Sequence, residues 1–90
     1  MDTSKLIKLE VEGGNVKPFQ AKGNFAHFLF VGSGTLSLHY SADDSHYDEE
    51  QKQFTIPPSG SINIEADLSK YSYYKITSTG TITEAYIKYE

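Results

Sequence analysis

The sequence predicts an all-β protein, an antiparallel two-sheet β-sandwich of the jelly-roll-like or immunoglobulin-like kind with about eight short strands. Short runs in which apolar and polar residues alternate recur along the chain, separated by Gly, Pro, Asn and Ser. Helical periodicity is hard to find. The 90 residues have room for one core, so we expect a single domain over residues 1–90. A small barrel is the alternative architecture.

The first expected strand covers residues 5–11, where three apolar residues alternate with charged ones and mark one buried face. A Gly-Gly-Asn turn at 13–15 then leads into a short segment at 16–19. Residues 25–31 are apolar on both faces except at His27, which predicts a strand covered on both sides. We interpret His27 as satisfied by hydrogen bonds in or near the core, in preference to a ligand or switch role.

Two hairpins are predicted in the remaining chain. The first joins residues 25–31 to residues 35–41 through Gly32-Ser33-Gly34, and the second closes at Ser78-Thr79-Gly80. Further strands are expected at 51–56 and 61–66. The side chains expected on the inward faces, and therefore in the core, are Ile7, Leu9, Leu29, Leu36, Leu38, Phe54, Ile56, Ile62 and Ile64.

Composition excludes several classes of function. The formal charge is -4, from 8 Lys and 12 acidic residues, and Arg is absent. Arg supplies the bidentate contacts to phosphate and guanine, so we expect no nucleic acid partner. Cys is also absent, which removes thiol nucleophiles, thiolate metal sites and stabilising disulfides. A domain this small without disulfides often depends on association, so we expect a homo-oligomer or a protein scaffold as partner.

Targeting segments are not recognisable. The N-terminus has no basic segment leading into an apolar run, and no apolar run approaches the roughly 18 residues of a membrane helix. We therefore expect no signal peptide, no membrane partner and synthesis in the cytoplasm.

The sequence contains no recognisable catalytic motif. There is no Gly-x-Ser-x-Gly elbow, and Gly32-Ser33-Gly34 lacks the context of a phosphate loop or a dinucleotide fingerprint. A carboxylate pair across a cleft, as in glycoside hydrolysis, is the remaining enzymatic alternative. We expect a protein that is not an enzyme, with no catalytic residues and no cofactor.

One segment contains residue types that bind divalent ions. Its imidazoles and carboxylates belong to His39, Asp43, Asp44, His46, Asp48, Glu49 and Glu50. The spacing of the acids does not match a calcium-binding loop, and no glycine provides the sharp turn. We expect a solvated, mobile surface loop and no metal site.

Crowded aromatic residues give the candidate interface. Three tyrosines fall within residues 71–74, so at least one ring lies on the opposite face from the others. Tyr rings near solvent are enriched at interfaces, although packing at the rim of the core explains them equally well. The candidates for contact with a partner are Phe28, Phe30, Tyr71, Tyr73 and Tyr74.

The C-terminal half resembles small β-sandwich structural proteins of tailed bacteriophages. The resemblance covers less than half of the chain and rests on residues 54–64 (FTIPPSGSINI), 67–71 (DLSKY), 74–76 (YKI) and 85–87 (AYI). It implies a virion protein, such as a capsid decoration or cement protein or a neck or tail accessory protein. It supplies no catalytic residues.

From these observations we expect a non-enzymatic structural protein of a virion that acts through protein–protein contacts. Two alternatives remain. A carbohydrate-binding β-sandwich module would use the exposed Tyr rings, and a small phage-encoded inhibitor of a host protein would place the acidic loop in a basic site.

Overall fold

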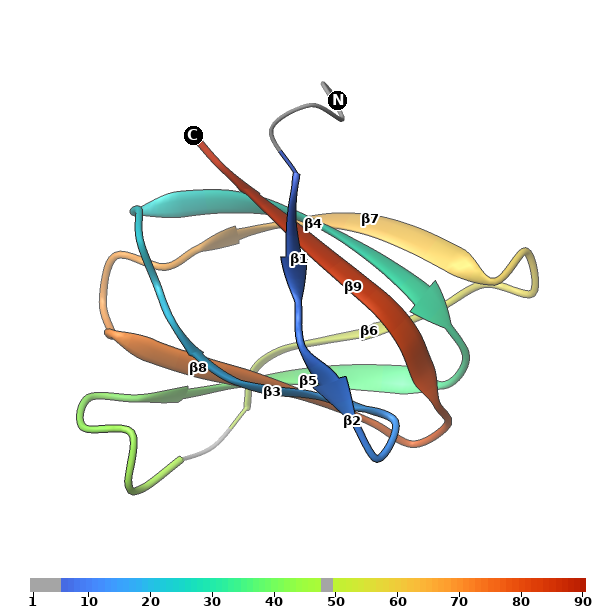
Figure 1. Cartoon of the computed structure of the whole chain (residues 1–90), viewed down its shortest axis with the longest axis horizontal. Helices are drawn as coiled ribbons and strands as arrows, with labels where there is room; N and C mark the ends of the chain where they lie inside the picture. Colours follow the sequence, from blue (N-terminus) through green and yellow to red (C-terminus); the bar gives the residue numbers. More distant parts are fainter. Residues whose placement is uncertain (1–5, 48–49) are drawn as a thin grey trace.

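The computed structural model describes residues 6–47 and 50–90, which form two antiparallel sheets packed face to face (Figure 1). The predicted two-sheet β-sandwich is confirmed. The sheets have the orders β1-β9-β4-β7 and β2-β3-β8-β5-β6. The described part of the chain contains no helix that is long and apolar enough to cross a membrane. The strands are β1 (Ile7–Leu9), β2 (Val11–Glu12), β3 (Asn15–Gln20), β4 (Phe25–Gly32), β5 (Thr35–Ser41), β6 (Glu50–Thr55), β7 (Ser61–Asp67), β8 (Tyr73–Ser78) and β9 (Ile82–Tyr89).

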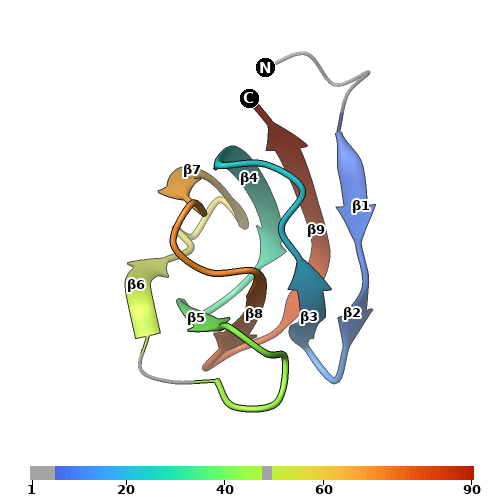
Figure 2. The same cartoon turned by 90° about the vertical axis from the view of Figure 1, so that its left-hand side faces the viewer.

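The single strand predicted at residues 5–11 is two strands in the structure. β1 pairs with β9 in the four-stranded sheet, whereas β2 pairs with β3 in the five-stranded sheet. The chain changes sheets at Glu10, and the two strands follow each other along one side of the sandwich (Figure 2). Gly13 and Gly14 both have positive φ and make the turn from β2 into β3, as predicted.

Both hairpins predicted from glycine-containing links are wrong. β4 and β9 belong to the four-stranded sheet, while β5 and β8 belong to the five-stranded sheet. The links at residues 32–34 and 78–81 are therefore corners that carry the chain between sheets. Gly and Ser signal a bend, but they do not specify whether the next strand pairs with the last or crosses to the other sheet.

The two corners pack against each other. The Ser33 amide donates to the Thr81 carbonyl at 2.9 Å, and the Ser78 hydroxyl donates to the Ser33 carbonyl at 2.8 Å. Gly34 has φ +97°, and a Cβ there would lie 2.3 Å from the nitrogen of Gly80. Glycine is required at this position both for its backbone conformation and for the close approach of the second corner.

Inward-facing side chains of both sheets form the core. Phe28 and Phe30 of β4 are stacked with their ring centroids 5.5 Å apart. Of the predicted core residues, four are buried, namely Leu9, Leu36, Leu38 and Ile56. Three more pack against the core while partly buried, namely Phe54, Ile62 and Ile64.

Two predicted core residues are placed differently. Ile7 is 48 % exposed, because it lies on a short edge strand at the end of the sandwich. Leu29 is half-buried on the outer face of β4, since its neighbours Phe28 and Phe30 occupy the inner face. Because both faces of this strand carry apolar residues, the alternation pattern does not show which face points into the core.

On the side opposite β1 and β2, the two sheets end in the edge strands β6 and β7. Lys52 of β6 reaches across, and its ammonium group donates a hydrogen bond to the backbone carbonyl of Glu65 in β7 at 2.8 Å. A lysine that caps an edge carbonyl in this way obstructs the pairing of a further strand.

Candidate binding surface

Three of the five predicted interface residues are in the core. Phe28, Phe30 and Tyr74 are 0 % exposed, and burial raises the pKa of the Tyr74 hydroxyl. They cannot touch a partner while the sandwich is folded, so their assignment to an interface is corrected. The alternation in β4 and β8 turns these rings inward, a choice that the sequence left open.

Tyr71 and Tyr73 are half-buried and lie on different surfaces. Tyr71 belongs to the loop between β7 and β8, and its ring stacks on Tyr40 with centroids 4.0 Å apart. Tyr73 is on the outer face of β8, because its neighbour Tyr74 faces inward. The structure therefore does not bring the predicted tyrosines together into one patch.

His27 lies on the outer face of β4 between two carboxylates. Its Nδ1 is 3.4 Å from Oε1 of Glu65, and its Nε2 is 3.0 Å from Oε1 of Glu90. The Phe25 ring packs against the imidazole in a T-shaped arrangement, with centroids 5.6 Å apart. The imidazole is satisfied as predicted, although on the outer face rather than in the core. Because both ring nitrogens face carboxylates, neither is presented to a substrate or a metal ion.

Hydrogen bonds within the acidic segment after β5 converge on Asp43. Asp43 accepts from the Ser41 hydroxyl at 3.0 Å and from the amides of Ser45 and His46 at 2.9 and 3.2 Å. These bonds stabilise the carboxylate and lower the pKa of Asp43 to about 2, the amide of Ser45 being the largest cause. This carboxylate closes a local turn. The expected surface loop is exposed over residues 42–46, and its mobility stays a prediction.

Of the other candidate metal ligands, His46 lies beside Asp43, with its Nδ1 3.6 Å from Oδ2 of that carboxylate. His39 is on the outer face of β5, where its Nε2 lies 3.1 Å from the Thr77 hydroxyl, and Asp44 accepts a hydrogen bond from Tyr47. Asp48 and Glu49 lie outside the described residues, as does the side chain of Glu50. Within the described part of the chain, no group of three or more His, Asp or Glu side chains is arranged to hold a metal ion.

An apolar groove lies at the end of the sandwich where β1, β3 and β9 come together. Its volume is about 160 Å³, and its apolar wall includes Ile7, the large hydrophobic side chain that is most exposed among the described residues. Tyr89 forms part of the wall and is held against the backbone at Gly23, where a Cβ would lie 2.9 Å from its ring. The groove is lined by Ile7, Leu9, Phe19, Gln20, Lys22, Ile87 and Tyr89.

A second, polar groove lies on the other side of the β3–β4 loop. It shares Gln20 and Lys22 with the apolar groove and has Tyr71 in its wall. The β3–β4 loop therefore separates the two grooves. Sequence reasoning missed this surface because its residues come from separate strands, and Ile7 was assigned to the core. The informative signal was the position of Ile7 at the start of the first strand, where few neighbours cover a side chain.

Fold and surface together define a small antiparallel β-sandwich with grooves at one end. Comparison with protein-family models, curated proteins and solved structures finds no match for this chain.

Proposed function

We propose that this domain is a non-enzymatic structural protein that acts through protein–protein contacts at the end of the sandwich that carries the apolar groove. The observation that supports this most is the half-exposed Ile7 beside that groove. The proposed setting is a phage virion, as a capsid decoration protein or a neck or tail accessory protein. The setting rests on the resemblance of the C-terminal half to such proteins.

Contact with a partner would remove Ile7 and its apolar surroundings from water. Covering the exposed half of Ile7 would contribute about 1 kcal/mol, and covering the neighbouring groove would add to it. Small domains have only about 5 to 15 kcal/mol of stability, so a modest interface matters for the stability of the whole domain. Association costs reduce this gain, which is why the contact must include more than Ile7.

The test is sedimentation velocity of the purified protein, together with co-purification with particles from cells in which its gene is expressed. We expect self-association or particle association, and we expect Ile7→Ser to weaken it with only a small drop in melting temperature, because about half of the Ile7 side chain is already in water. Tyr73→Ala tests the outer face of β8 as the contact instead, with the same two measurements.

A protein that is strictly monomeric and missing from particles would overturn the proposal. So would association that both variants leave intact, because the two surfaces best suited to a contact would then be excluded.

A second candidate function has its own supporting observation. The outer face of the five-stranded sheet presents hydroxyl, amide and imidazole groups over three adjacent strands, with the Tyr73 ring at one end. Such groups hydrogen-bond to sugar hydroxyls, and a ring stacks on a sugar face. Binding to a glycan array, lost in both His39→Ala and Tyr73→Ala, would favour a carbohydrate-binding module. The side chains concerned are Thr35, Ser37, His39, Gln53, Thr55, Tyr73 and Thr77.

A further inference from the structure

The apolar groove combines a small hydrophobic hollow with a single charge. Its volume of about 160 Å³ is close to that of an apolar cavity of about 150 Å³, which holds one benzene molecule. The groove is therefore the right size for one aliphatic or aromatic side chain. Apart from the Gln20 amide and the Lys22 ammonium group, the lining side chains are apolar or aromatic.

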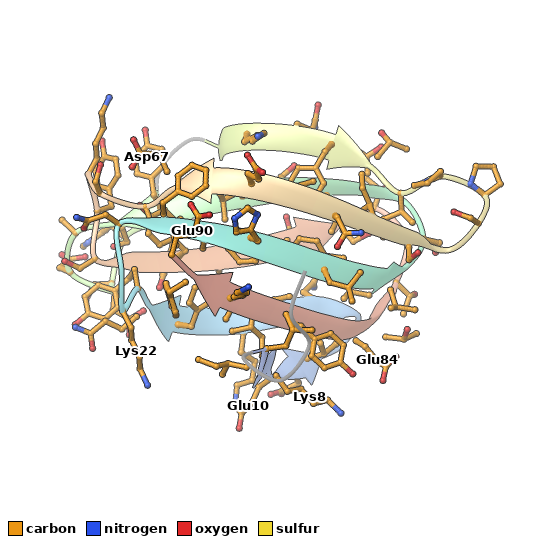
Figure 3. All side chains as sticks on the ribbon, turned by 90° about the horizontal axis from the view of Figure 1, so that it is seen from above. Lys8, Glu10, Lys22, Asp67, Glu84 and Glu90 are labelled. Atoms are coloured by element: carbon orange, nitrogen blue, oxygen red, sulfur yellow. The ribbon has the colours of Figure 1, made fainter. Side chains whose placement is uncertain are left out.

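Lys22 is a cation with no ion pair among the described residues. It belongs to the β3–β4 loop and projects outward at one end of the molecule, away from Glu10 and Glu84 (Figure 3). The chain as a whole carries a charge of -4, and Lys22 places a positive charge in the lining of the apolar groove. An incoming carboxylate would find an available counter-charge here.

We propose that the apolar groove binds a segment of a partner protein that inserts one aliphatic or aromatic side chain and places a carboxylate beside Lys22. The proposal specifies which chemical groups the partner presents to the apolar groove, and it rests on the proposed function. The groove supplies the apolar contact with Ile7, Phe19 and Tyr89, and Lys22 selects for an adjacent negative charge.

The experiment is a titration of the ¹⁵N-labelled full chain, followed by amide chemical shifts, with two matched probes. N-acetyl-leucine carries the carboxylate, and N-acetyl-leucinamide has the same side chain without the charge. Probes of this size are expected to bind with a dissociation constant on the order of millimolar. We expect both to shift amides of β1, β3 and β9, and the carboxylate to bind about two- to fivefold more tightly, as an exposed ion pair allows.

Three variants locate the effect. Lys22→Met should bring the two probes to equal affinity, Ile7→Ser should weaken both, and Lys8→Met should change neither, because Lys8 does not line the groove although its loss removes the same charge. High salt should abolish the preference for the carboxylate in the unmodified protein. Thermal melts of each variant confirm that it is folded.

Equal affinities for the two probes in the unmodified protein would overturn the proposal, as would no shifts at all. Shifts that appear only after removal of residues 1–5 would assign the groove to the chain's own N-terminal segment and also overturn it. Concentration-dependent shifts at the groove without any probe would assign it to a second copy. If Ile7→Ser abolishes assembly while the probes bind equally, this proposal fails and the proposed function stands. If assembly is also absent, both fail.

Discussion

Along one long side of the sandwich, β1 and β2 follow each other and pair with both sheets, whereas along the opposite side β6 and β7 are separate edge strands (Figure 2). On the first side, continuous main chain links the two sheets, and both edge strands are short. The second is bridged by a side chain, the ammonium group of Lys52 on the carbonyl of Glu65. The two sheets are thus joined by continuous main chain on the first side and by one hydrogen bond on the second. We expect these two connections to differ in strength.

A matched pair of isoleucines gives the largest expected difference. Ile87 of β9 and Ile64 of β7 lie opposite the same residue, Phe28, one on each side. Ile87 is buried between strands, while Ile64 is only partly buried on the edge strand. We expect Ile87→Ala to lower the free energy of unfolding by about 2–5 kcal/mol and Ile64→Ala to cost at least about 1 kcal/mol less. Urea denaturation measures both, and equal losses would contradict the proposed contrast between the sides.

Replacing Lys52 tests whether its ammonium group protects the edge strands β6 and β7 from pairing with a further strand. Lys52→Met keeps the length of the side chain but loses the hydrogen bond to Glu65, so the cost in stability should be below about 1 kcal/mol. Self-association through β7 should increase, because an edge carbonyl and its neighbours become available to another strand. Light scattering over time measures this. Lys8→Met, the same change on β1, is the control, and equal aggregation of the two variants would show that charge alone is responsible.

The smallest effect concerns the turn that leads into β6. The pKa of Asp43 is lowered to about 2 in the folded protein, below the ordinary value of 3.8, so its carboxylate stabilises the fold above about pH 4 and loses this effect as the pH falls through about 2. Asp43→Asn should therefore lower the melting temperature slightly at pH 7, and the difference should close between about pH 4 and pH 2. Circular dichroism melts measure it. A difference that stays constant with pH would exclude the carboxylate as its cause.

Strands with one polar face could be predicted from the sequence, and strands with two apolar faces could not be oriented. In β5, Leu36 and Leu38 alternate with polar residues, so their burial followed directly. In β4 both alternating sets are apolar, and the choice between Leu29 and Phe28 depends on which set fits opposite the second sheet. Tyr74 posed the same problem, since a tyrosine suits either face.

The strand connections and the surface grooves could be predicted even less well, because they depend on tertiary structure. Gly32 and Gly34 indicated a bend, but the second corner packed against them comes from residues 78–81, which no local pattern connects to them. The apolar groove has the same origin, because Ile7, Phe19 and Tyr89 belong to three strands and become neighbours only in the fold. The contacts of His27 with Glu65 and Glu90 likewise involve distant positions.

The pairing of β1 with β9 also affects the rate at which the native state is reached. Ile7 lies opposite Ile87, so the four-stranded sheet acquires its full width only when segments from the two extremes of the described sequence meet. Closing so long a loop is entropically costly before any contact offsets it, which places this domain among slow, non-local folders. Until β9 occupies its place between β1 and β4, Phe28 and Phe30 lack part of their cover. Incompletely folded chains would therefore present these rings to one another, and dilution or a chaperone would raise the yield of native protein.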